Sequence, residues 1–241
     1  SGRNQHRVHV ILGDKNCDLD STVSALTYAY FLTQINPSGN LCIPVLNIRR
    51  TESGFNRAIG FIQQQLSIPD SCFIFQDEID LHQLNTEGKL SLTLVNSNVL
   101  TRTDRALQSA VVKVISQVEQ CDGVSLELPE SYSSVVTKQI LEEAPNLVTQ
   151  QLAHLLRGAI LCKCMSSGSE KMSSKHEEIV AVLEEKYPEL PSREDVICNL
   201  KEHKLDMQDL GIEQILLKEL KELSDGEIKV AISSVYMTLE V

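Results

Sequence analysis

The chain has 241 residues, of which 42% are hydrophobic and 23% charged, and its formal net charge is −11. These values are typical of a globular protein with one or two domains, and they exclude a disordered chain. Nucleic-acid backbones are held by clustered Lys and Arg, so we do not expect this acidic chain to bind nucleic acid. No apolar run reaches the roughly 20 residues that span a bilayer, and the chain does not open with a signal-like segment. We therefore expect a cytoplasmic protein with no membrane contact from this segment.

The cysteines are odd in number and lie in mostly apolar segments, which is typical of buried, reduced thiols. They are Cys17, Cys42, Cys72, Cys121, Cys162, Cys164 and Cys198. No Cys-x-x-Cys pair with a matching His cluster occurs, so we expect neither disulfides nor a zinc site.

Strand-like and helix-like segments alternate in the first half of the chain. Strands are predicted at residues 7–12, 42–46, 72–75, 92–95, 111–115 and 124–128, with helices at 21–34 and 55–66. This alternation predicts an α/β fold with a mostly parallel sheet and helices on both faces.

After Pro129 the sequence is mainly helical. Helices are predicted at residues 131–143, 148–165, 176–186, 194–202 and 212–223, and a strand at 228–237. Two prolines in residues 187–191 indicate a helix end and a linker. We predict one domain over residues 1–188 and the incomplete start of a second, α+β domain over residues 192–241.

Three carboxylates follow the first predicted strand, at Asp14, Asp18 and Asp20. The carboxyl edge of an open α/β sheet is where ligands bind, so this turn is the best candidate site. Carboxylates at this spacing are costly to gather unless a cation or a basic group neutralises them. Asp20 and Ser21 are natural cap residues, so in the alternative interpretation one acidic side chain caps the following helix and the others are solvated.

Four segments in order along the chain resemble motifs of one family. They are residues 17–26 (CDLDSTVSAL), 44–50 (PVLNIRR), 77–82 (DEIDLH) and 229–233 (KVAIS). The chain resembles the prune-type exopolyphosphatases of the DHH phosphoesterase superfamily, which are related to the manganese-dependent family II pyrophosphatases. The resemblance implies that residues 1–188 form a DHH domain and residues 192–241 the beginning of a DHHA2 domain.

The resemblance also implies a hydrolase site that holds two divalent ions, and here this chain departs from the family. Asn96, Ser97 and Asn98 stand where the family has its Asp-His-His triplet. The following Asp-His pair is replaced by Ser116 and Gln117, and the last metal-binding Asp is replaced by Lys163. Three of the four metal motifs are therefore broken, whereas the first motif persists.

Two hypotheses follow for Lys163. Its ammonium would occupy the space of a lost ion and neutralise Asp18 and Asp20, or it would extend to solvent at a drifted site. Because Asp14 adds a third carboxylate, we expect either no cofactor or one weakly bound Mg²⁺ or Mn²⁺ ion. Arg49 and Arg50 are candidates for contact with phosphate, or else a solvated pair in a loop.

Two functions are consistent with these residues. In the first, the chain is a catalytically impaired phosphoesterase fold that works as a protein-interaction or scaffold domain. Its partners are then proteins of unknown identity, and it still binds a phosphate-containing small molecule. In the second, the chain is a slow Mg²⁺- or Mn²⁺-dependent pyrophosphatase or short-chain exopolyphosphatase. The substitutions at Asn96, Ser116 and Lys163 distinguish the two.

Overall fold

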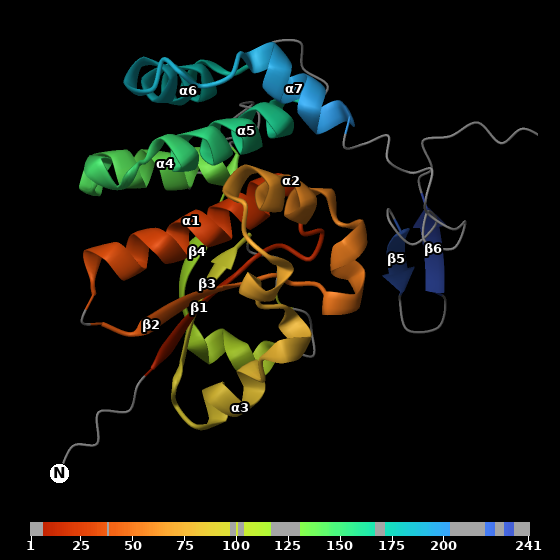
Figure 1. Ribbon diagram of the computed structural model, residues 1–241. Helices are drawn as coiled ribbons and strands as arrows, with labels where there is room; N and C mark the ends of the chain where they lie inside the picture. Colours follow the sequence, from red (N-terminus) through yellow and green to blue (C-terminus); the bar gives the residue numbers. More distant parts are fainter. Residues whose placement is uncertain are drawn as a thin grey trace, which may run out of the picture.

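The computed structural model describes residues 7–37, 39–96, 100, 104–116, 131–166, 172–202, 220–224 and 229–233, and Figure 1 shows their arrangement. The strands are β1 (Val8–Leu12), β2 (Leu41–Val45), β3 (Leu90–Val95), β4 (Val111–Ile115), β5 (Leu220–Ser224) and β6 (Lys229–Ser233). The α-helices are α1 (Leu19–Ile35), α2 (Arg57–Leu66), α3 (Leu81–Thr86), α4 (Tyr132–Glu143), α5 (Gln150–Ser166), α6 (Ser174–Lys186) and α7 (Arg193–Glu202). Short 3-10 turns are η1 (Arg50–Phe55), η2 (Asp70–Cys72), η3 (Gln76–Glu78), η4 (Arg105–Ala110) and η5 (Pro145–Leu147).

The first four strands form one parallel sheet in the order β2-β1-β3-β4. In the centre of the sheet, Val8 pairs with Leu41 on one side and with Leu90 on the other. Because all four strands run in the same direction, their carboxyl ends meet at one edge, where the turns after β1 and β3 lie. The predicted parallel α/β sheet is confirmed.

Helices cover both faces of this sheet, as the sequence predicts (Figure 1). Ile11 faces the core formed with α1, α2, α4 and α5, whereas its neighbours Val10 and Leu12 face a smaller core on the side of α3 and η4. Successive side chains of a strand point to opposite faces, so a strand buried on both sides is apolar at consecutive positions. None of the described helices is both long and apolar enough to cross a membrane.

Two predicted elements are wrong. Residues 72–75 do not form a strand: η2 ends at Cys72, and only Phe75 makes an isolated parallel bridge, to Leu46. This bridge lies just beyond β2, where the neighbouring backbone has already turned. Residues 220–223, predicted as the end of a helix, belong to β5, which pairs antiparallel with β6. Pairing with a partner strand overrides the local helical preference there.

Other predictions fall on residues that are not described. The strand at residues 124–128 and the helix at residues 212–219 lie outside the described residues. The division between residues 188 and 192, and the assignment of a DHHA2 domain, stay predictions. Among the six described cysteines, Cys72 and Cys198 are exposed, contrary to the expectation that the thiols are buried.

Candidate functional site

The turn that joins β1 to α1 holds two of the predicted acidic residues through short local hydrogen bonds. Asp14 accepts the backbone N–H of Asn16 at 3.1 Å. Cys17 adopts a positive φ of 44°, which reverses the chain before the helix. Asp18 is the N-cap of α1 and accepts the backbone N–H of Ser21 at 2.7 Å. Asp18, and not Asp20 or Ser21, is therefore the capping residue, because the helix begins earlier than predicted.

Asp20 is turned away from this loop and lies in the interior. Its side chain is only 3% exposed. One carboxylate oxygen accepts the backbone N–H of Tyr132 at 2.9 Å, and the other accepts that of Ser133 at 2.8 Å. Both donors belong to the first turn of α4, where backbone N–H groups have no partner inside the helix. The carboxylate of Asp20 thus occupies the anion-binding end of α4.

Burial disfavours the charged form of Asp20, whereas its hydrogen bonds favour it. Burial raises the pKa of Asp20 to about 6, and the nearby charge of Asp18 adds to this rise. The N–H groups of Ser133 and Tyr132 act in the opposite direction because they stabilise the carboxylate. At neutral pH the side chain is therefore ionised, and both of its oxygens are acceptors.

The remaining N–H groups of the first turn of α4 are also satisfied. Ser131 is the N-cap and accepts the N–H of Ser134 at 2.9 Å. The N–H of Ser131 itself is accepted by Nε2 of His176 at 2.9 Å, and Nδ1 of His176 lies 3.5 Å from Sγ of Cys164. The start of α4 is consequently filled by side chains of the protein itself.

Asn96, which stands where the family has the Asp of its Asp-His-His triplet, contacts Asp14. Its Nδ2 donates to the second carboxylate oxygen of Asp14 at 2.7 Å. Asn96 follows β3 and has a φ of 92°, a left-handed conformation that Asn adopts more readily than most residues. The sequence predicts that both residues lie at the carboxyl edge of the sheet, but it does not predict this hydrogen bond. This hydrogen bond offsets part of the negative charge of Asp14 without a cation.

Tyr132 is a site residue that sequence reasoning missed. It is buried, with 6% of its surface exposed. Burial raises the pKa of its phenol, and the charges of Asp14, Asp20 and Asp18 raise it further. The ring therefore lies within the electrostatic reach of all three carboxylates. Its only sequence signal was its place at the start of a predicted helix.

Lys163 lies in the last turn of α5 and is partly buried. Among the ion pairs between described residues, none joins Lys163 to Asp18 or Asp20. The oxygens of Asp20 accept helix N–H groups instead. The hypothesis that Lys163 neutralises the first motif stays a prediction for Asp18, and Asp20 does not require it.

The other substituted positions are only partly described. Ser116 follows β4 and is exposed. Ser97, Asn98 and Gln117 lie outside the described residues.

The two candidate phosphate-contact residues differ in their surroundings. Arg50 donates to Glu78 and Asp70, and its guanidinium lies over the ring of Phe75, 4.5 Å from the centroid. These bonds fasten η1 to η2 and η3, so Arg50 holds the loop together. Arg49 is exposed, and its guanidinium has no ion-pair partner among the described residues. The contact of either residue with phosphate stays a prediction.

The described residues do not fit the two-metal centre that the resemblance implies. They contain no group of three His, Cys, Asp or Glu side chains placed to hold a metal ion. Both carboxylate oxygens of Asp20 accept backbone N–H groups of α4. Those of Asp14 accept N–H groups of Asn16 and Asn96. Divalent hard cations need several free oxygen ligands, and the second carboxylate oxygen of Asp18 is the main one left.

Comparison with known proteins identifies similar chains. No family model matches the chain. The chain is 58% identical to protein prune homolog 2 of Mus musculus over 234 residues, which are 97% of this chain and 8% of that protein. It is 40% identical to exopolyphosphatase PRUNE1 of Homo sapiens over 241 residues, covering 97% of this chain and 53% of the human protein. The chain thus spans about half of one of these relatives and a small part of the other.

A solved structure shares the fold. The crystal structure of a putative family II inorganic pyrophosphatase of Methanococcus jannaschii superposes with a TM-score of 0.58 at 18% identity, covering 95% of this chain and 71% of that chain. At this identity the match bears on the fold alone. The chain is therefore similar to prune proteins over nearly its whole length, and it shares the fold of a family II pyrophosphatase.

Proposed function

We propose that this chain is a prune-type phosphoesterase fold whose two-metal site is impaired, and that it works as a protein-interaction or scaffold domain. Its partners are then proteins, with a phosphate-containing small molecule as a secondary ligand and the cytoplasm as its compartment. The Asp20 carboxylate, bound by two N–H groups of α4, is the observation that carries this proposal.

Two divalent ions bring four positive charges, which a hydrolase site balances with carboxylates and orients with imidazoles. In this chain a neutral amide stands at Asn96, a hydroxyl at Ser116 and a cation at Lys163. The carboxylates that remain are already hydrogen-bonded inside the protein. Recruiting an ion would require these bonds to break with few new ligands to replace them.

The alternative is a residual Mg²⁺- or Mn²⁺-dependent pyrophosphatase or short-chain exopolyphosphatase. Asp18 favours it, since this carboxylate has an oxygen that is not used in capping α1. The relationship to a human protein named as an exopolyphosphatase also favours it. Asp14, Asp18 and Asp20 would then hold one weakly bound ion.

Phosphate release distinguishes the two functions. The purified protein is incubated with pyrophosphate or tripolyphosphate in Mn²⁺ or Mg²⁺, beside the Asp18→Ala variant. We expect the wild-type protein to release no more phosphate than Asp18→Ala. A metal-dependent release that the substitution abolishes would show that the protein is an enzyme.

A further inference from the structure

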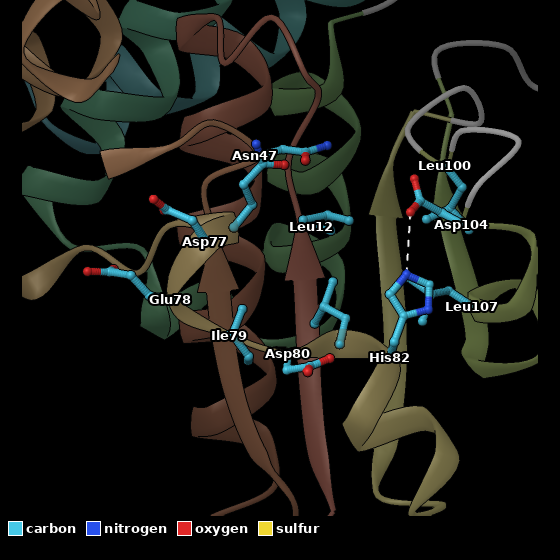
Figure 2. Close-up of a pocket in the computed structure, with 12 residues that line it drawn as sticks. Leu12, Asn47, Asp77, Glu78, Ile79, Asp80, His82, Leu100, Asp104 and Leu107 are labelled. Atoms are coloured by element: carbon cyan, nitrogen blue, oxygen red, sulfur yellow. Dashed lines mark ion pairs between the residues drawn. The ribbon is translucent and has the colours of Figure 1, made fainter. Parts of the chain in front are cut away.

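A cavity of about 540 Å³ lies on the α3 side of the sheet, separate from the carboxylates of the first motif (Figure 2). Its apolar lining includes Leu12, Ile79 and Leu107. Asp77 and Asp80 line it as well, and both are exposed. Exposed carboxylates keep their hydration, so this cavity does not require a ligand. The buried groups that lack a partner lie elsewhere, in α5.

Two side chains of α5 each bury a nitrogen atom that has no hydrogen-bond partner. These atoms are Nδ1 of His154 and Nε of Arg157, and no other buried side-chain nitrogen or oxygen of the described residues lacks a partner. The two residues are three positions apart, so they lie on the same face of the helix. Burial lowers the pKa of His154, and the charge of Arg157 lowers it further. The two side chains are therefore neighbours in the interior.

Apolar side chains from two other helices pack over this part of α5. The ring of Phe61 in α2 is buried, and its centroid lies 6.4 Å from that of the His154 ring. Val196 of α7 is buried too. Both side chains meet over Gly158, where a Cβ would lie 3.5 Å from Phe61 and 3.8 Å from Val196. Neither side chain has a polar atom to offer to the two nitrogens.

The other nitrogens of Arg157 bind the segments that follow α5. Arg157 is 2% exposed, its Nη1 donates to Glu184 of α6 at 3.0 Å, and its Nη2 donates to the carbonyl of Pro191. Pro191 precedes Ser192, whose hydroxyl accepts the N–H of Asp195 at 3.1 Å at the start of α7. The guanidinium therefore fastens α6 and the linker before α7 to α5. Of its three nitrogens, Nε is the one that no described residue satisfies.

A ligand for these two atoms has to accept one hydrogen bond and donate another. Nε of a guanidinium is always a donor, and Nδ1 of a neutral imidazole is an acceptor when the proton is on Nε2. The lowered pKa keeps His154 neutral at neutral pH. An anion has no proton to donate to Nδ1, and the charge of Arg157 is already balanced by Glu184. Water both accepts and donates, and two polar partners are enough to hold it in an interior.

We propose that one buried water molecule bridges Nε of Arg157 and Nδ1 of His154, and that this bridge orients the guanidinium that fastens the linker and α7 to α5. The bridge satisfies two buried groups that otherwise carry a desolvation cost. It places the proton of His154 on Nε2 and makes His154 a positioning residue for Arg157. The inference does not depend on the proposed function, because no residue of the first motif takes part in the bridge.

Nuclear magnetic resonance of the ¹⁵N-labelled protein tests the bridge at both atoms. At neutral pH, long-range ¹H–¹⁵N correlations of the His154 ring should show the proton on Nε2 and none on Nδ1. The Nε–H of Arg157 should give a nuclear Overhauser cross-peak with water, although the side chain is buried. A proton on Nδ1 would overturn the proposal. So would a scalar coupling between the two nitrogens, because it would show a direct hydrogen bond in place of the water.

Three variants separate the positioning role of His154 from its packing. His154→Phe keeps a ring and removes Nδ1, whereas His154→Asn keeps a polar acceptor near the place of Nδ1. The matched control is His82→Phe, at an exposed histidine of α3. The readout is deuterium exchange of the Val196 N–H, which bonds to the carbonyl of Ser192 at 3.1 Å in the first turn of α7.

We expect His154→Phe to speed this exchange about tenfold, and His154→Asn and the control to stay within about twofold of wild type. Equal acceleration in the Phe and Asn variants would show that only the packing of the ring matters, and it would overturn the positioning role. Unchanged exchange in His154→Phe would overturn it as well.

Discussion

At the scale of single residues, Asp20 determines how the first family motif is used. The sequence shows a carboxylate two residues after Asp18 and cannot show that it reaches the start of α4, more than 100 residues later in the chain. That contact depends on how α1 and α4 pack. The capping role was predicted for the right turn but assigned to Asp20 or Ser21, whereas Asp18 performs it.

The pKa of Asp20 predicts how stability depends on pH. The folded pKa of about 6 lies above the ordinary value of 3.8, so the carboxyl favours folding most below pH 4 and loses this contribution as pH rises through 6. The difference corresponds to about 3 kcal/mol. Urea unfolding should therefore show a larger gap in stability between wild type and Asp20→Ala at pH 4.5 than at pH 7. A gap that grows toward pH 7 would mean that the two N–H donors outweigh burial.

Asn96→Asp restores the family's carboxylate beside Asp14. Since Asn96 donates to Asp14 at 2.7 Å, the substitution replaces a hydrogen bond by like-charge repulsion. We expect a loss of about 1 to 2 kcal/mol in EDTA, which lowers the Tm by roughly 2 to 8 °C. Added Mn²⁺ should recover much of this loss, because the carboxylates can then share an ion.

Asn96→Gly is the matched control for this experiment. Glycine accepts the positive φ of this position and adds no charge. Its Tm should not respond to Mn²⁺. If both variants recovered equally, the ion would be acting elsewhere in the protein.

At the scale of elements, the parallel sheet was predictable because its strands are short, apolar and separated by helical segments. Each of the four strands was predicted to within a few residues. The prediction of a strand at residues 72–75 was wrong because a run of four apolar residues is typical of a buried turn as well as of a strand. The prediction of a helix end at residues 220–223 was wrong because pairing of Leu220–Ser224 with β6 outweighs the helix-like composition.

An ion-pair cluster joins α5 to α6 and to the start of α7, and the sequence did not indicate it. Arg157 is 2% exposed and donates to Glu184 at 3.0 Å, while Arg193 donates to Glu184 and Glu177. These partners are 9 to 27 residues apart, so no local pattern links them. The cluster fixes the helices that follow the sheet.

Glu184→Gln should destabilise the protein by on the order of 3 kcal/mol, because it leaves the buried Arg157 without its counter-charge. The pKa of Glu184 is lowered, first by its hydrogen bond from Arg193. Its contribution is therefore present above the ordinary value of 4.5 and is lost as pH falls through the folded pKa. Chemical unfolding should show the two proteins converging in stability at low pH. The neighbouring exposed Glu185→Gln should behave like wild type at all pH values.

At the scale of the whole molecule, the sequence predicted the fold class and the sheet edge that carries the first motif. It did not predict the cavity beside α3, because Leu12, Asn47, the segment around Asp80 and Leu107 meet only when β1, β2, α3 and η4 are assembled. The sequence identified, by their positions, the residues that replace the metal ligands of the family. It could not show that Asp14 and Asp20 had acquired partners inside the protein.

Binding of Mn²⁺ tests the central claim most directly, because the claim concerns the metal site and not a particular substrate. The electron paramagnetic resonance signal of free Mn²⁺ is followed as protein is added, for wild type, Asp18→Ala and Asp20→Ala. We predict that the wild-type protein leaves the free signal nearly unchanged at equal concentrations of protein and ion, as do the two variants. Stoichiometric loss of the signal in wild type, abolished in Asp18→Ala and Asp20→Ala, would contradict the account and show that the first motif still holds a metal ion.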